Sequence, residues 1–288
     1  MLGSRFALSC SSWFLVPGEG MKGFEILNRA SACLVRCKNP KFPYKVHVLA
    51  SSHVVAPWKW PKYYPLDWIQ RINEHYCHYS IETRDKKGVF ISQHDLHPCV
   101  YHHPSRDLAV IHLDNEDKAL EALKQIGVEI YDLADTKDLS TNTENLHFYG
   151  HDIAGESSAE TDERKPVPFS SVGKITLASD YQIFTRTHSI LPQGMCGGPV
   201  LIDIQKTPPG EHHKLVGITE GIIPHDYPQE DLRDLAVFVE SPSIQKFLES
   251  IENNSIRPVV GKQLYNDEFK DLKAEDINIV DELRKTGY

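Results

Sequence analysis

The chain has 288 residues and a formal net charge of −9, with 40 acidic against 31 basic residues. This acidic balance and the lack of a basic stripe exclude nucleic acid and an anionic membrane surface as expected partners. No apolar stretch reaches the roughly 18 residues that a transmembrane helix needs, so we expect no membrane span.

Residues 1–23 form an N-terminal segment whose possible role is targeting. Its first 16 residues contain one Arg and no acidic residue, and Ser9-Cys10-Ser11-Ser12 interrupts the apolar run. The segment resembles a mitochondrial presequence faintly and a signal peptide imperfectly. We therefore leave its role open and begin the first lobe at residue 24.

Residues 24–115 carry short β-type runs, which predict strands over 32–35, 46–50, 79–83, 89–92 and 108–113. The second of these runs ends in a turn that presents His53, and the last begins just after Asp107. Between them, residues 57–76 hold three Trp, three Tyr and three Pro. This aromatic insertion is either a surface loop that buries its own rings or a lid and partner-binding surface beside His53.

The run His94-x2-His97-x-Cys99-x2-His102-His103 offers five side chains of metal-ligating type. Its spacing matches no established zinc pattern, so we interpret it as a histidine-rich loop. We expect no metal site and no cofactor.

A charged linker with a helix over 118–126 is predicted within residues 116–143. Residues 144–251 then resume the short β-type runs, at 146–149, 172–177, 182–187, 200–204, 215–218 and 236–239, and close with a helix over 244–251. Many short strands separated by turn residues predict barrels or sandwiches. Residues 252–288 are a charged C-terminal arm.

The most informative feature is Gly-Met-Cys-Gly-Gly-Pro at residues 194–199. Glycine allows the tight turn that leaves backbone N–H groups around Cys196 free to face a substrate. A thiol needs a neighbouring base or cation to become a strong nucleophile. His53 and Asp107 precede Cys196 in the His, Asp, nucleophile order of the chymotrypsin template.

Ser52-His53-Val54-Val55, the run from Arg106 to Val110, and the hexapeptide resemble the three signature blocks of trypsin-like peptidases, closest to the HtrA/Deg branch, with cysteine at the nucleophile position. The resemblance implies an all-β-dominated fold of two six-stranded antiparallel barrels, a C-terminal helix and an appended tail. It implies a cleft between the lobes with His53, Asp107 and Cys196 as a catalytic triad.

The same resemblance implies an oxyanion hole formed by the backbone N–H groups of Gly194 and Cys196. It places the substrate pocket among Ile190, Ile218, Thr219 and Glu220, and Glu220 would favour a basic side chain there. The expected substrate is a protein or peptide, cleaved through an acyl-enzyme.

Two other functions stay open. A catalytically inactive binding or assembly subunit would use residues 57–76 or 252–288 as contact surfaces for a protein partner. A thiol redox sensor would need a second Cys near Cys196 in sequence, and none is near. Secreted trypsin relatives have a bridged Cys directly after the catalytic His, where this chain has Val54. We therefore expect reduced thiols and an intracellular location, cytoplasmic or mitochondrial.

Overall fold

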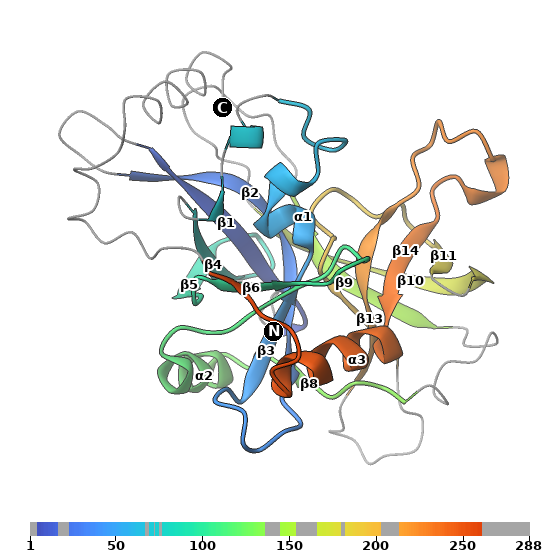
Figure 1. Ribbon diagram of the computed structural model, residues 1–288. Helices are drawn as coiled ribbons and strands as arrows, with labels where there is room; N and C mark the ends of the chain where they lie inside the picture. The colour runs from blue at the N-terminus through green and yellow to red at the C-terminus, as the bar shows by residue number, and fades with distance from the viewer. Residues whose placement is uncertain are drawn as a thin grey trace.

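The computed structural model describes residues 5–16, 23–66, 69–71, 73–74, 77–135, 145–153, 166–179, 182–202 and 213–260. Strands dominate these residues and form two sheets that lie side by side, the first on the left and the second on the right of Figure 1. The helix α3 (Ser241–Glu252) runs below them.

The first sheet contains β1 (Leu8–Val16), β2 (Gly23–Arg36), β3 (Val46–Ala50), β4 (Cys77–Arg84), β5 (Phe90–Asp95), β6 (Cys99–His102), β7 (Ala109–Ile111), β8 (Ile130–Tyr131) and β15 (Val259–Val260). The order is β15-β6-β7-β3-β2-β1-β4-β5, and β8 pairs with β2 in parallel. Where we expected a first barrel of six antiparallel strands, the structure has a nine-stranded sheet. The additional strands β8 and β15 come from segments that we had assigned to the linker and to the arm.

The strand β1 lies inside the first sheet, between β2 and β4. The first sheet thus begins at Leu8 and not at residue 24. The three serines that interrupt the apolar pattern are buried, and two of them find polar partners. Ser12 Oγ donates to the carbonyl of Val54 at 2.7 Å, and Ser11 Oγ accepts a hydrogen bond from Arg29 Nε at 2.8 Å.

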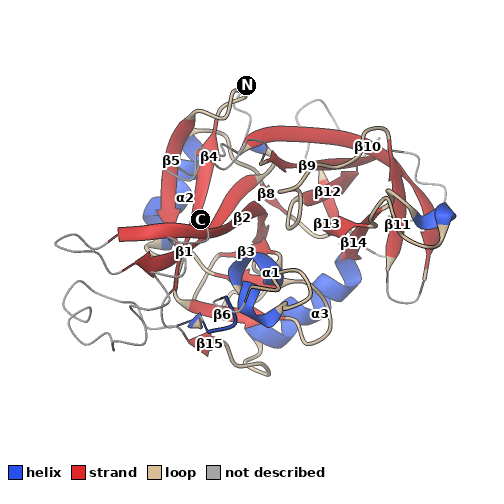
Figure 2. Ribbon diagram, turned by 90° about the horizontal axis from the view of Figure 1, so that it is seen from above, coloured by secondary structure: helices blue, strands red, loops and turns tan. Residues whose placement is uncertain are grey.

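The second sheet is a closed six-stranded antiparallel barrel, as expected for this lobe. It contains β9 (Leu146–Asp152), β10 (Val167–Ala178), β11 (Ile183–Thr187), β12 (Pro199–Ile202), β13 (Lys214–Ile222) and β14 (Ala236–Glu240), in the order β10-β11-β14-β13-β12-β9. Figure 2 shows this group from above, separate from β1, β4 and β5. Phe148 and Phe238 fill the barrel and meet edge to face, with ring centroids 6.2 Å apart.

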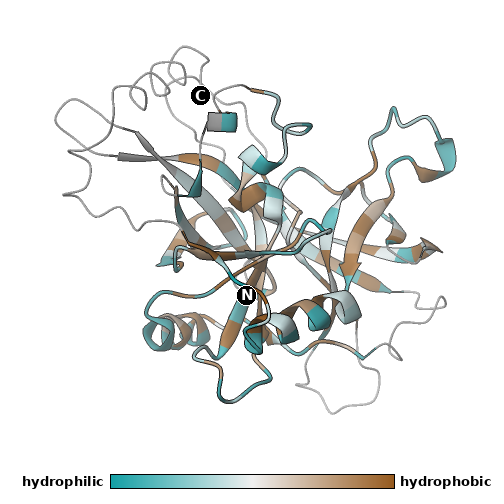
Figure 3. Ribbon diagram, viewed as in Figure 1, coloured by the Kyte–Doolittle hydropathy of each residue, from teal (hydrophilic) through white to brown (hydrophobic). Residues whose placement is uncertain are grey.

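Three α-helices complete the described fold: α1 (Ser52–Val55), α2 (Glu116–Gln125) and α3. In α3 the apolar side chains recur at helical spacing, and Ile244, Phe247, Leu248 and Ile251 are buried. They share one core cluster with residues of both sheets, and Figure 3 shows apolar and polar residues alternating along α3.

Of the helices that the structure describes, none has both the length and the apolar character needed to cross a bilayer. The last 28 residues of the predicted C-terminal arm, 261–288, and residues 136–144 of the predicted linker lie outside the described part of the chain.

Candidate active site

His53 belongs to α1, the single helical turn that follows β3. Val54 and Val55 on this turn are buried in the core of the first lobe, which leaves the His53 side chain at the surface with 16% of its area exposed. Asn28 Nδ2 donates a hydrogen bond of 3.2 Å to the His53 carbonyl. The apolar residues therefore anchor the turn, and the histidine faces outward from a fixed backbone.

Asp107 lies in the loop between β6 and β7 and is nearly buried. Its Oδ1 accepts a hydrogen bond of 2.8 Å from the backbone N–H of His53, and its Oδ2 accepts one from His53 Nδ1. These two contacts fix the ring orientation and keep the proton on Nδ1, so the other ring nitrogen is free to act on a nucleophile.

Glu220, on β13, holds the loop that carries Asp107. Its carboxylate accepts hydrogen bonds from Nε and Nη2 of Arg106, at 3.1 and 2.7 Å, and from the backbone N–H of Asp107 at 3.1 Å. Such a paired carboxylate and guanidinium form strong, directional hydrogen bonds. The negative charge that we expected to attract a basic substrate side chain is therefore matched by Arg106 of the same chain.

The loop around Cys196 is held by Ser31 of β2. Ser31 N donates to the Cys196 carbonyl at 3.0 Å, and Ser31 Oγ donates to the Gly194 carbonyl at 2.6 Å. Gly194 and Gly197 have φ of 98° and 80°, a region that favours glycine. A Cβ on Gly197 would lie 2.2 Å from the Ser31 carbonyl oxygen, so this close approach also excludes a side chain.

The two amides assigned to the oxyanion hole have defined directions. The Gln193 carbonyl accepts a hydrogen bond of 3.0 Å from Ile153 N, and the Met195 carbonyl accepts one of 3.0 Å from Gly198 N. Because C=O and N–H of a trans peptide point in opposite directions, the N–H groups of Gly194 and Cys196 face away from these partners. Within the described residues, neither N–H donates a hydrogen bond.

Cys196 is partly exposed, and its side chain interacts with the His53 ring. Burial by itself lowers the pKa of His53. The hydrogen bonds and charges of Asp107 and Cys196 outweigh it and raise that pKa to about 10. The structure thus brings together the imidazole, the carboxylate and the sulfur from three distant parts of the sequence.

The predicted pocket residues lie in different environments. Ile218 and Thr219 have no exposed surface, whereas Ile190 exposes 64% of its area. Thr219 anchors the loop around Cys196 through its backbone, accepting from Gly197 N and donating to the Gly198 carbonyl, each at 2.8 Å. Its position one residue before Glu220 gave no sign of this role in the sequence.

Three aromatic rings of the insertion surround His53. The ring centroids of Trp60, Tyr63 and Tyr64 lie 6.3, 5.9 and 6.2 Å from that of His53. Tyr63 is the exposed member, at 68% of its area. The described part of residues 57–76 therefore packs next to the imidazole and does not form a separate surface loop.

The histidine-rich run does not form a common site. His102 Nδ1 contacts Ser52 Oγ at 2.7 Å, His94 Nε2 contacts Ser92 Oγ at 3.3 Å, and the His103 ring accepts from the backbone N–H of Arg106 at 3.1 Å. Across the described residues, the side chains grouped closely enough to hold a metal are others, Cys37, His47 and Glu252.

No protein-family model matches the chain, and no curated protein sequence matches it. What the site can do is therefore argued from the contacts described above.

Proposed function

We propose that the protein is a trypsin-fold cysteine endopeptidase that cleaves protein or peptide substrates with Cys196, His53 and Asp107. The observation that carries this proposal is the pair of hydrogen bonds that His53 donates to the Asp107 carboxylate, from its backbone N–H and its ring, while the ring also interacts with Cys196. If the His53–Asp107 pair served only to stabilise the fold, it would not require a thiol beside the histidine. A thiol next to a base, with an acid that orients the base, is the arrangement that acyl transfer requires.

In the proposed mechanism, the proton of Cys196 rests on His53, and the thiolate attacks the carbonyl carbon of the scissile peptide. The new C–S bond leaves an oxyanion, which the N–H groups of Gly194 and Cys196 stabilise. Each such donor is worth roughly 2.7–4 kcal/mol in measured cases. His53 then protonates the leaving amine as the C–N bond breaks. Water, deprotonated by His53, hydrolyses the thioester and releases the thiol.

The trypsin fold is part of the proposal because the first sheet curls back on itself. Asp114 N donates to the Asp95 carbonyl at 3.0 Å and His97 N to the His112 carbonyl at 2.8 Å. These bonds join the end of β5 to the segment after β7, at opposite sides of a six-strand run. We interpret that run as the first barrel of a two-barrel peptidase, with β6, β8 and β15 added to it.

The cysteines support an intracellular location for this enzyme. The six thiols are free, and Cys10, Cys33 and Cys77 are buried away from any oxidant. Free thiols persist in reducing compartments, in the cytoplasm or the mitochondrion.

The decisive experiment is alkylation of the full chain with iodoacetamide over a range of pH, with the modified cysteine mapped by mass spectrometry. Cys196 should react faster at neutral pH than the other thiols, because His53 takes its proton. Burial raises the pKa of Cys99, and likewise that of Cys37, so these two partly exposed thiols serve as internal controls. His53→Ala should remove the early reaction, and His225→Ala, at a solvent-exposed histidine, should not.

Cleavage is measured in parallel on a fluorescent peptide mixture. Cys196→Ala should abolish cleavage while the circular dichroism spectrum is unchanged. An alkylation profile that is the same with and without His53, together with cleavage that survives Cys196→Ala, would refute the peptidase.

One observation favours a second candidate, a protease-like binding subunit without activity. Trp60, Tyr63 and Tyr64 crowd the imidazole, and a bound partner could use the same rings. Early alkylation of Cys196 without cleavage of any peptide would support this second function.

A further inference from the structure

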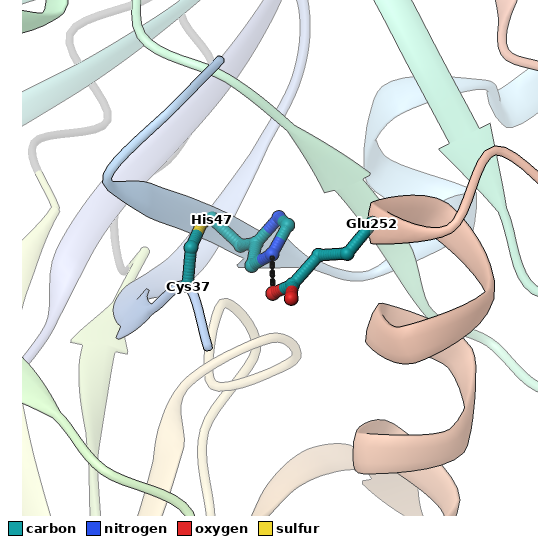
Figure 4. Close-up of side chains that lie close together, drawn as sticks. All are labelled: Cys37, His47 and Glu252. Atoms are coloured by element: carbon teal, nitrogen blue, oxygen red, sulfur yellow. Dashed lines mark hydrogen bonds and ion pairs between the residues drawn. The ribbon is translucent and has the colours of Figure 1, made fainter. Parts of the chain in front are cut away.

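A second cluster of reactive side chains lies where the end of α3 meets the turn between β2 and β3. Cys37 directly follows β2, His47 lies on β3, and Glu252 is the last residue of α3. Figure 4 shows the three side chains pointing toward one another across this junction. The cluster is separate from the triad and is not used in the proposed mechanism.

The donor atoms of this cluster are close enough to share one ion. One ligand atom from each residue, Cys37 Sγ, a ring nitrogen of His47 and a carboxylate oxygen of Glu252, all lie within 4.8 Å of one another. His47 Nε2 and Glu252 Oε1 are 2.9 Å apart. In a tetrahedral zinc site, ligand atoms are separated by roughly 3.3–3.7 Å, as metal–ligand bonds of about 2.0–2.3 Å require. Small movements of these three side chains are therefore enough for them to bind one zinc ion together.

The outer contacts are those that metal ligands commonly have. His47 Nδ1 lies 3.0 Å from Nε2 of the buried His112, and the Tyr44 ring stacks on His112 with centroids 4.0 Å apart. A metal-bound histidine usually has its second nitrogen held in this way, which sets the tautomer and the ring orientation. The Glu252 carboxylate is likewise fixed, by the backbone N–H groups of Lys38 and Asn39 at 3.0 and 2.7 Å.

The charges around the cluster favour a cation. The Glu252 carboxylate places a negative charge within 4.8 Å of the Cys37 sulfur. The carbonyl end of α3 adds the negative end of a helix dipole at the same point. A divalent cation would compensate both.

We propose that Cys37, His47 and Glu252 bind one Zn²⁺ or a similar transition-metal ion that fastens the end of α3 to the β2–β3 turn. Thiolate, imidazole and carboxylate are the ligand types that zinc prefers, with water as the fourth ligand. As the metal–sulfur bond forms, Cys37 releases its proton to solvent. The proposal does not depend on the peptidase activity.

The test uses the full chain with Cys196→Ala, so that the triad cannot supply a thiol ligand. Metal is removed with a chelator, and Co²⁺ is then titrated in as a spectroscopic substitute for Zn²⁺. We expect one ion per chain with a thiolate-to-cobalt charge-transfer band. Adding Cys37→Ser should remove the band. Cys99→Ser is the matched control because Cys99 is also partly exposed, and it should keep the band.

Glu252→Gln provides a second variant that leaves the cysteine in place, and it should weaken Co²⁺ binding at least tenfold. Zn²⁺ should raise the melting temperature of the parent and not of this variant. Binding without the charge-transfer band in the parent, or equal bands in the parent and in Cys37→Ser, would overturn the proposal.

Discussion

Asp107 is constrained on both sides, because its carboxylate binds His53 and its backbone N–H is held by Glu220. Asp107→Asn keeps the shape of the side chain but presents an amide to the imidazole and favours the wrong tautomer. We expect kcat to fall about 10⁴-fold, as in the equivalent change in the Ser-His-Asp template. Steady-state cleavage with active-site titration measures this, and a loss below tenfold would contradict the role of Asp107.

The proton on His53 predicts a pH dependence. Burial lowers the pKa of His53, but Asp107 and Cys196 raise it overall, to about 10. A group whose folded pKa is raised contributes stability that is complete below its unfolded pKa of about 6.5 and is lost as pH rises through the folded value. Between pH values of about 6.5 and about 10, the His53 ring therefore also keeps a proton that it can donate.

We therefore expect kcat/KM to decline as pH rises through about 10, which is the value given for the folded state. The pH–rate profile measures it, and Asp107→Asn should move the alkaline limb to lower pH because it removes one of the groups that raise the pKa. An alkaline limb in the wild type near the ordinary histidine value would contradict this prediction.

At the scale of elements, the strand β2 supports the loop around Cys196 through Ser31. Ser31 Oγ donates to the Gly194 carbonyl and accepts from His151 N, at 2.6 and 2.9 Å. Ser31→Ala leaves both groups unpaired in a buried place, so we expect the free energy of unfolding to fall by about 1–3 kcal/mol. Cleavage should fall as well, since the loop loses its position.

Urea denaturation and steady-state cleavage of Ser31→Ala test this expectation. Ser250→Ala on the exposed face of α3 removes a hydrogen bond within one helix, to the carbonyl of Lys246. It should change the free energy of unfolding by no more than about 0.5 kcal/mol. Equal effects of the two substitutions would mean that Ser31 has no special part in the loop.

Most elements could be predicted from the sequence because their apolar residues follow the period of a strand or helix. Residues 46–50 match β3, and the predicted helix over 244–251 lies within α3. The strand β1 could not be predicted in this way. Its serines are buried in a sheet where Arg29 and the Val54 carbonyl provide partners for Ser11 and Ser12, and no local pattern shows that.

The residues of the candidate site show the same difference between those that lie in a local sequence pattern and those that do not. His53, Asp107 and Cys196 each lie in a short pattern that can be recognised alone. Glu220 and Ser31 act through partners 113 and 163 positions away, Asp107 N and the Gly194 carbonyl. Only the folded chain reveals such contacts.

At the scale of the molecule, α3 joins the two sheets into one core. Phe247 is 3% exposed and shares a cluster with Leu49 and Val110 of the first sheet and Leu215 and Val239 of the barrel. We expect Phe247→Ala to lower the free energy of unfolding by about 3–5 kcal/mol. Because the cluster belongs to both sheets, both should unfold together in one transition at lower denaturant concentration.

Two probes separate the lobes in this measurement. Trp13, Trp58 and Trp60 report on the first lobe by fluorescence, while amide exchange in β9–β14 reports on the barrel. Leu177→Ala, at an exposed barrel residue, is the control and should have little effect. Separate midpoints for the two probes in Phe247→Ala would show that the lobes are independent.

The division of the triad between two sheets also has a temporal consequence. His53 and Asp107 are synthesised long before Cys196, and the loop that holds the sulfur is fastened to Ser31, 163 positions earlier than Gly194. The same loop is also held by Thr219 of β13, which is synthesised after it. We therefore expect the sulfur to reach its place beside His53 only after β13 has been made.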